Sequence, residues 1–142
     1  MIKTLDALLL DATTDVEFIS NLANTAAYLN SEMKGLSWIG FYLLDEGVLK
    51  LGPFVGKVAC TKIAIGKGVC GTAFEKNETL IVEDVHTFPG HIACDAGSNS
   101  EIVVPFKYGV LDADSYSFSN FTTDDKILLE SVCSLLEKKD KR

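Results

Sequence analysis

The chain has 142 residues, of which 47% are hydrophobic and 23% are charged, a composition typical of a folded domain rather than a disordered chain. Its 20 acidic side chains outnumber its 13 basic ones and give a net charge of −7, and a surface of that sign repels phosphate backbones, so we expect no nucleic-acid partner. No apolar run approaches the roughly 18 residues that a membrane span needs, and the first residues are too acidic for a signal peptide. We therefore expect a cytoplasmic protein that binds no membrane.

The first half of the chain predicts one long helix followed by strands. Thr14 and Glu17 have the spacing of a capping box, and apolar residues follow at helical intervals, which predicts a helix over about 14–32. Aromatic and aliphatic runs, separated by turn residues such as Asp45-Glu46-Gly47, predict a series of strands. These strands cover residues 38–44, 48–55 and 60–65.

The second half predicts a short helix, three more strands and a closing helix. A Gly-Lys-Gly break precedes the helix at 69–76, and Thr122 or Thr123 begins the last helix, which has an acidic first turn and a basic end. The strands cover residues 79–82, 101–106 and 108–113. The stretch 83–98 is too irregular for a regular element, and loops of that length in compact domains are usually functional. This order indicates an α+β fold with an antiparallel sheet.

Four cysteines, Cys60, Cys70, Cys94 and Cys133, give the first chemical signal. Structural disulfides are rare in the cytoplasm, so cysteines there are more often buried, catalytic or metal-binding. No pair has the two-residue spacing of a zinc knuckle or a thioredoxin-like motif, so we expect no metal site. Cys133 falls on the apolar face of the last predicted helix, where we expect a core residue.

Cys94 lies in the irregular stretch, near His86 and His91. It is either a nucleophilic thiol, which needs partial exposure and a site that stabilises thiolate, or a buried small side chain. The two histidines either transfer protons or bind a metal, or they have a structural role with ring nitrogens bonded to the backbone. Cys60 and Cys70 lie near glycine-rich turns and are either core residues or thiols that condense with a sulfenic acid on a nearby nucleophile.

Three acidic and two aromatic residues complete the candidate site: Glu101, Asp112, Asp114, Trp38 and Tyr42. Asp112 and Asp114 are two positions apart on a predicted strand and therefore share a face. Carboxyl groups that face a cleft can have raised pKa values and donate a proton, or can bind a ligand's ammonium group, whereas solvated strand ends do neither. Trp38 and Tyr42 also share a face, either within the core or around a small apolar group such as an S-methyl.

Seven short motifs follow one another between Leu51 and Asp114. They are Leu51-Gly-Pro-Phe-Val-Gly56, Ala59-Cys60, Gly66-Lys-Gly-Val-Cys-Gly71, Asp84-Val-His86, Pro89-Gly-His-Ile-Ala-Cys-Asp95, Ser100-Glu-Ile-Val-Val-Pro105 and Gly109-Val-Leu-Asp-Ala-Asp114. In their order and spacing, the motifs resemble the free methionine-(R)-sulfoxide reductases, which are single-domain GAF-fold enzymes. The resemblance implies a six-stranded antiparallel sheet with helices packed against it, a single GAF domain over residues 1–142, and a homodimer.

The same resemblance implies an activity and roles for the cysteines. The activity is the reduction of free L-methionine-(R)-sulfoxide, with thioredoxin as the reductant that recycles the enzyme and with no cofactor. Cys94 matches the nucleophile that becomes a sulfenic acid, Cys60 matches the principal resolving cysteine that forms the disulfide, and Cys70 matches an auxiliary thiol.

The carboxyl and aromatic residues also have counterparts in that family. Glu101, Asp112 and Asp114 match the carboxyl groups that bind the sulfoxide oxygen and the amino-acid end of the substrate. Trp38 and Tyr42 match the aromatic wall around the methyl group. The alternative function is a GAF module that senses a small ligand or the redox state without turnover.

One segment departs from the family pattern. Only Phe106-Lys107-Tyr108 separates Pro105 from Gly109, a link shorter than the family's usual hairpin. So few residues cannot form a two-strand extension at about 3.3 Å per residue, so either the hairpin is trimmed or residues of it are absent from this sequence.

Overall fold

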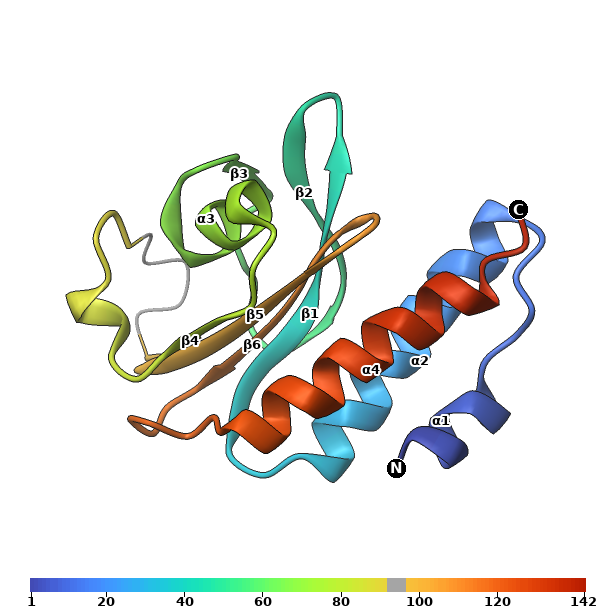
Figure 1. Cartoon of the computed structure of the whole chain (residues 1–142), viewed down its shortest axis with the longest axis horizontal. Coiled ribbons are helices and arrows are strands. Elements are labelled where there is room, and N and C mark those ends of the chain that lie inside the picture. Colours follow the sequence, from blue (N-terminus) through green and yellow to red (C-terminus); the bar gives the residue numbers. More distant parts are fainter. Residues whose placement is uncertain (92–96) are drawn as a thin grey trace.

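The computed structural model describes residues 1–91 and 97–142, and these form one antiparallel sheet with helices on both faces (Figure 1). Within these ranges the strand order is β3-β2-β1-β6-β5-β4. The strands are β1 (Leu36–Asp45), β2 (Val48–Val55), β3 (Lys62–Ala64), β4 (Leu80–Val82), β5 (Ser100–Phe106) and β6 (Gly109–Ser115). All five neighbouring pairs are antiparallel, which confirms the predicted α+β fold and its six-stranded sheet.

The helices divide between the two faces of the sheet. Their bounds are α1 (Ile2–Leu8), α2 (Asp15–Glu32), α3 (Gly68–Lys76) and α4 (Thr123–Lys139), with a short 3-10 helix η1 (Val85–Thr87). The long helices α2 and α4 lie side by side over one face, and α3 lies over the other (Figure 1). The predicted long helix and closing helix are therefore confirmed, since they begin within a residue or two of the expected caps.

Alternate residues of each strand supply two separate cores, as period-two side-chain alternation requires. On β1, Ile39 and Phe41 are fully buried beneath α2 and α4. Trp38 and Tyr42 are buried on the opposite face, in the cluster that includes Cys70 of α3. Helices α2 and α4, the helical layer, therefore cover one face of the sheet, while the face that α3 covers carries the candidate functional residues.

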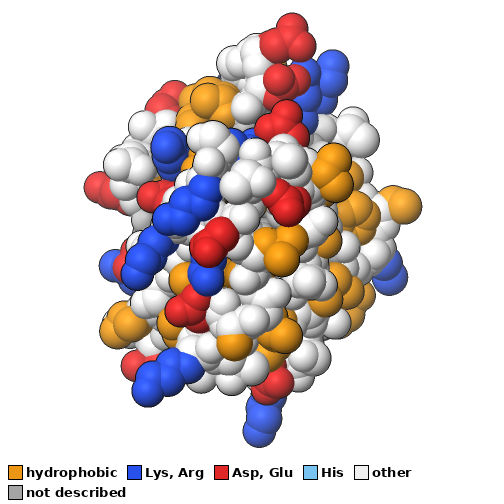
Figure 2. All heavy atoms as spheres, turned by 90° about the vertical axis from the view of Figure 1, so that its right-hand side faces the viewer, with side chains coloured by type: hydrophobic (Ala, Val, Ile, Leu, Met, Phe, Trp, Pro, Cys, Tyr) orange, Lys and Arg blue, Asp and Glu red, His pale blue; other side chains and the backbone are white. Residues whose placement is uncertain are grey.

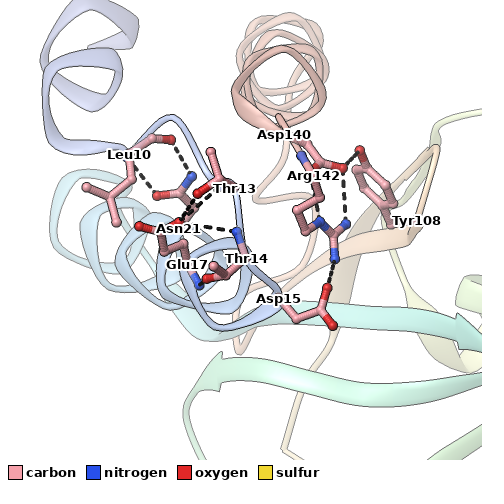
Figure 3. A network of polar contacts seen from close by, with 9 residues as sticks. All are labelled: Leu10, Thr13, Thr14, Asp15, Glu17, Asn21, Tyr108, Asp140 and Arg142. Carbon is pink, nitrogen blue, oxygen red and sulfur yellow. Dashed lines mark hydrogen bonds and ion pairs between the residues drawn. The ribbon is translucent and has the colours of Figure 1, made fainter.

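A polar network fixes the start of α2 (Figure 3). The Thr14 hydroxyl accepts from the Glu17 amide at 3.1 Å, and the Glu17 carboxylate accepts from the amides of Thr13 and Thr14, which completes the predicted capping box. The Asn21 side chain pairs with the Leu10 backbone, accepting from its N–H at 2.9 Å and donating to its carbonyl at 2.8 Å. These contacts hold the segment between α1 and α2 against the second helix.

A second network joins the C-terminal residues to the β5–β6 turn and to α2 (Figure 3). The Arg142 guanidinium lies 3.9 Å from the centroid of the Phe18 ring and donates to Asp140 at 2.8 Å and to Asp15 at 3.0 Å. The Tyr108 hydroxyl donates to the Asp140 carboxylate. Burial, with the Asp140 contact second, raises the pKa of Tyr108 to about 12.

The β5–β6 hairpin closes in a tight turn. Only Lys107 and Tyr108 form its turn, and Phe106 pairs with Gly109 at its tip. Gly109 has φ +153°, and a Cβ atom there would lie 2.0 Å from the Tyr42 carbonyl oxygen of β1. A glycine is therefore required where the hairpin approaches its neighbouring strand.

Three elements differ from the prediction. Helix α1 is not predicted, because its seven residues are too few to show a helical pattern of apolar residues. Its Leu5 is fully buried in the core that α2 and α4 cover, so tertiary packing stabilises this short helix. The third predicted strand is reduced to the three residues of β3, which leaves Cys60 in the preceding loop. The irregular stretch contains η1, whose N-cap Asp84 accepts from the His86 amide at 3.0 Å.

The face formed by the helical layer carries charges of both signs with apolar side chains between them (Figure 2). The exposed apolar residues of α1, α2 and α4 include Leu8, Val16, Ile19 and Ile127. Of the helices in the described residues, none combines the length and the apolar character that crossing a membrane requires.

Candidate functional site

A cavity of about 50 Å³ lies between α3 and the face of the sheet that α3 covers. Six of the residues predicted from the sequence line it: Trp38, Tyr42, Cys70, Glu101, Asp112 and Asp114. They come from β1, α3, β5 and β6, which are adjacent in the fold but distant in the sequence. A cavity of this volume has room for more than one water molecule, which needs about 10–15 Å³ by the same measure.

The aromatic wall of the cavity is a stack. The Trp38 ring stacks on Tyr42, with centroids 5.9 Å apart, and on Phe54, with centroids 5.3 Å apart. The Trp38 indole N–H donates to the Lys57 carbonyl at 3.1 Å, and the Tyr42 hydroxyl donates to the Cys60 carbonyl at 3.0 Å. Their polar atoms are thus held on the backbone, so the ring faces present an apolar surface to the cavity.

Glycines make room for this stack. A Cβ atom on Gly40 would lie 2.8 Å from the Trp38 ring and 2.3 Å from the Phe54 Cβ. Gly56 has φ +141°, and a Cβ there would lie 2.5 Å from Trp38 Cδ1. The sequence left open whether Trp38 and Tyr42 lie in the core or around a ligand. Both descriptions hold, because the two rings are buried and also line the cavity.

The carboxyl groups lie on the floor of the cavity. Glu101 and Asp112 are 7% and 5% exposed, so the alternative of solvated strand ends is wrong for both. Burial raises the pKa of Glu101 well above its usual range, and the charges of Asp112 and Asp114 raise it further. Burial also raises the pKa of Asp112. The cluster therefore keeps protons that exposed carboxylates lose, and it can donate them.

Cys70 lies in the first turn of α3 with its thiol buried against these acids. Its Sγ donates to the Glu101 Oε2 at 4.0 Å. Burial, followed by the charges of Asp112 and Glu101, raises the pKa of the Cys70 thiol well above its usual range. Close packing places it there, because a Cβ on Gly71 would lie 2.4 Å from the Ala64 carbonyl of β3.

The other cysteines occupy three different settings. Cys60 is half-buried beside the core cluster that contains Trp38 and Tyr42, and it is disulfide-bonded. Cys94, the predicted nucleophile, lies outside the described residues. Cys133 is a free thiol, 3% exposed, in the core beneath α4, which confirms its prediction as a core residue.

One of the two histidines, His91, lines the cavity, and the other lies next to it. The exposed His86 ring has its Nδ1 2.8 Å from the Asp84 carboxylate, so the partner of that ring nitrogen is a side chain and not a backbone group. Its centroid lies 6.2 Å from that of His91, which lines the cavity. Burial, with the His86 charge second, lowers the pKa of His91.

Some lining residues escaped sequence reasoning. Ile63 of β3, Lys67 of the connecting loop and Val69 of α3 all line the cavity. The sequence feature that could have indicated these residues is the Gly-Lys-Gly break at 66–68, because it marks a tight turn close to the candidate residue Cys70.

Comparisons with known proteins agree with this geometry. The GAF domain family model matches residues 16–137. The free methionine-R-sulfoxide reductase of Escherichia coli is 50% identical over 129 residues, which cover 87% of this chain and 78% of the relative.

Two solved structures of such enzymes superpose closely. The reduced form of the Staphylococcus aureus enzyme matches with a TM-score of 0.90 and 46% identity, over 96% of this chain and 90% of that one. The free methionine-R-sulfoxide reductase of Neisseria meningitidis, solved in complex with its substrate, matches with a TM-score of 0.90 and 43% identity, over 96% of this chain and 84% of that one. The chain therefore belongs to the free methionine-(R)-sulfoxide reductases, a family of GAF-domain oxidoreductases.

Proposed function

We propose that this protein reduces free L-methionine-(R)-sulfoxide to L-methionine in the cavity between α3 and the sheet. The observation that carries the proposal is the juxtaposition of buried carboxyl groups with a stacked aromatic wall in a single cavity. The similar free methionine-R-sulfoxide reductases, including that of Escherichia coli, support the same substrate.

Each part of the substrate has a complementary group in the cavity. The Trp38 and Tyr42 rings suit the S-methyl group, because an aromatic face is a favourable partner for sulfur and methyl. The negative charge left on the acid cluster suits the ammonium group. The small volume suits a free amino acid, since a peptide would need openings for two chain ends.

The reaction needs an acid and a nucleophile. A sulfoxide sulfur is electrophilic when its oxygen is protonated, and Glu101, whose pKa burial raises, is a suitable proton donor. Attack by the Cys94 thiolate on the protonated sulfoxide forms a bond between the Cys94 sulfur and the substrate sulfur. The hydroxyl group then transfers to the Cys94 sulfur as that sulfur–sulfur bond breaks, which releases methionine and leaves a sulfenic acid on Cys94.

The Cys60 thiol resolves that intermediate. Its sulfur attacks the Cys94 sulfenic acid, which releases water and forms a Cys60–Cys94 disulfide. Two thiols are thus oxidised for each sulfoxide reduced. A dithiol protein of the thioredoxin type has a reduction potential low enough to return both cysteines to thiols. Cys70 serves as an auxiliary thiol beside the acids.

A single-turnover experiment tests this proposal. The protein is reduced, freed of reductant, and mixed with the separated R and S epimers of free methionine sulfoxide. We expect about one methionine per chain from the R epimer alone, with a new Cys60–Cys94 disulfide in the peptide map. Cys94→Ser should release none, and Cys60→Ser should release methionine without forming that disulfide. Methionine from neither epimer would support a ligand-sensing GAF module instead.

A further inference from the structure

We propose that Cys70, Glu101 and Asp112 form a binding site for a thiophilic divalent cation, Zn²⁺, at the floor of the cavity. One potential ligand atom from each residue lies within 4.8 Å of the other two, and all three residues are buried. The binding of the metal is independent of the proposed reductase activity; only its inhibitory effect, argued below, rests on that function.

The three atoms are close enough to bind a zinc ion once the side chains contract around it. Tetrahedral zinc with a sulfur ligand at about 2.3 Å and an oxygen ligand at about 2.1 Å separates the two ligand atoms by about 3.6 Å. The Cys70 Sγ and the Glu101 Oε2 are 4.0 Å apart. That pair must contract by about 0.4 Å, and any pair of ligand atoms at the 4.8 Å limit by about 1.2–1.4 Å, through rotation about side-chain torsions.

A second observation points to a missing cationic partner. The Oδ1 atom of Asp112 is buried and has no hydrogen-bond partner within the described structure, although the residue lines the cavity and is only 5% exposed. Buried polar atoms are nearly always satisfied, so such an atom marks a position for a ligand. Lys67, a cation in the cavity lining, forms no ion pair with Glu101 or Asp112 among the described residues.

The donor set selects the kind of metal. One thiol and two carboxyl groups combine a soft ligand with hard ones, which suits Zn²⁺ better than Mg²⁺ or Ca²⁺, since those ions prefer six or more oxygen ligands. Zinc takes the Cys70 sulfur as a thiolate and the carboxyl groups as carboxylates, so binding releases to solvent both the thiol proton and the proton that the acid cluster keeps. Three protein ligands leave a fourth coordination position toward the cavity, which a water molecule fills.

The fold brings the three ligands together while the Cys60 disulfide is formed. The ligands come from α3, β5 and β6, which pack directly against one another. Cys70 is a free thiol while Cys60 is disulfide-bonded, so the site needs no reduction of that disulfide. A zinc ion here occupies the carboxyl groups that the proposed reaction uses, and so makes Zn²⁺ a reversible inhibitor that competes with the sulfoxide.

Sequence motifs could not indicate this site. A zinc knuckle places its cysteines two residues apart, and the chain has no such pair, which is why the sequence predicts no metal site. Here one cysteine combines with carboxyl groups from two other elements, and only the register of β5 against β6 brings them together.

Co²⁺ is the first probe, because a cobalt–thiolate bond gives a near-ultraviolet charge-transfer band. The protein is used with its Cys60 disulfide intact, so that the Cys60 sulfur cannot bind the probe. We expect about one Co²⁺ per chain with a charge-transfer band that Zn²⁺ abolishes by displacement. Cys70→Ser should lose the band. Asp112→Asn should weaken Co²⁺ binding by at least about 100-fold. Replacing a residue that only hydrogen-bonds to a metal ligand costs about 10–100-fold in affinity, and Asp112 is itself a ligand in this proposal.

Cys133→Ala is the matched control, because it removes the other buried free thiol, in the core beneath α4. It should bind Co²⁺ as the wild type does. Thermal unfolding of the unloaded variants verifies that each is folded. If Cys70→Ser does not fold, Cys70→Ala replaces it. A band that persists without Cys70, or the absence of Co²⁺ binding to folded wild-type protein, overturns the proposal.

Inhibition is measured separately. Zn²⁺ buffered by a chelator should raise the apparent KM for methionine-(R)-sulfoxide with little change in kcat, and Cys70→Ser should require at least about 100-fold more zinc. A protein that binds Co²⁺ through Cys70 but reduces no sulfoxide contradicts the proposed function and leaves the metal site intact. Active protein that binds no metal contradicts the site alone.

Discussion

Glu101 on β5 and Asp114 on β6 are direct cross-strand partners, and both side chains line the same cavity. Like charges placed directly opposite each other destabilise a sheet unless one is neutralised. The charge of Asp114 is one of the causes that raise the pKa of Glu101, after burial and the charge of Asp112. The sheet register thus holds a proton on the acid cluster, where the proposed reaction needs one.

Replacing Glu101 tests its role as proton donor. Glu101→Gln keeps the shape and removes the acidic proton, so we expect kcat for methionine-(R)-sulfoxide to fall by about 100- to 10,000-fold, the usual contribution of general acid catalysis. The measurement is steady-state turnover of the R epimer, with thermal unfolding as the check on folding. Glu83→Gln, which removes an exposed carboxyl group, is the control and should leave turnover unchanged. Equal turnover by the two variants would contradict the acid role.

The acid cluster also makes stability depend on pH. Because burial raises the pKa of Glu101 above 4.5 and that of Asp112 above 3.8, the folded state holds more protons than the unfolded state above those values. The free energy of unfolding therefore falls as the pH rises from the unfolded pKa values toward the folded ones. The slope is about 1.4 kcal/mol per pH unit for each proton.

Urea unfolding between mildly acidic and mildly alkaline pH measures this slope. Glu101→Gln has one fewer titrating group, so its stability should decline less steeply than that of the wild type as the pH rises. A wild-type stability that rises with pH over this range would contradict the raised pKa values.

A pair of glycines separates steric contact from backbone strain. Gly56 and Gly47 both have positive φ, at +141° and +77°, but a Cβ atom added at Gly56 would lie 2.5 Å from Trp38 Cδ1, whereas one added at Gly47 would meet nothing within 4 Å. Gly47→Ala should cost about 1 kcal/mol of stability, from backbone strain alone. Gly56→Ala should cost about 2–4 kcal/mol and also raise KM, because Trp38 must shift. Urea unfolding and steady-state kinetics measure both effects; an unchanged KM in Gly56→Ala would show that the Trp38 ring does not bind substrate.

The contact between Tyr108 and Asp140 should stabilise the fold without affecting turnover. Tyr108→Phe removes a hydrogen bond to a carboxylate, for which we expect a loss of about 1–3 kcal/mol in the free energy of unfolding. Tyr28→Phe is the control, since its hydroxyl makes only a 3.5 Å contact with the Met1 carbonyl. Chemical denaturation measures both variants. A loss of reductase activity in folded Tyr108→Phe would contradict a purely stabilising role.

Local patterns predict most of the fold because they depend on neighbouring residues. The capping box at Thr14, the start of the last helix at Thr122 or Thr123 and the alternation along β1 can be read directly from the sequence, and the structure confirms them. Helix α1 could not be predicted, since its seven residues are stabilised by the burial of Leu5 against distant helices.

The candidate site is predictable in its residues but not in its geometry. The shared face of Asp112 and Asp114 follows from their spacing, and that of Trp38 and Tyr42 does likewise. That Glu101 pairs with Asp114, and that Cys70 lies against Glu101, depends on strand register and on the packing of α3. No local pattern encodes either relationship.

The unbroken pairing of β5 with β6 constrains which insertions and deletions the chain can accept. Successive residues of a strand face opposite sides of the sheet, so one residue inserted near the start of β6 would reverse the side chains that follow it. Leu111 and Ala113 would then face the cavity, and Asp112 and Asp114 would face the hydrophobic core beneath α2 and α4. Removing matched residues from both strands at the tip, by contrast, preserves every pair below it. Paired length changes at the Lys107-Tyr108 turn therefore keep the acids in place, but they disturb the close approach at Gly109 and the contact between Tyr108 and Asp140.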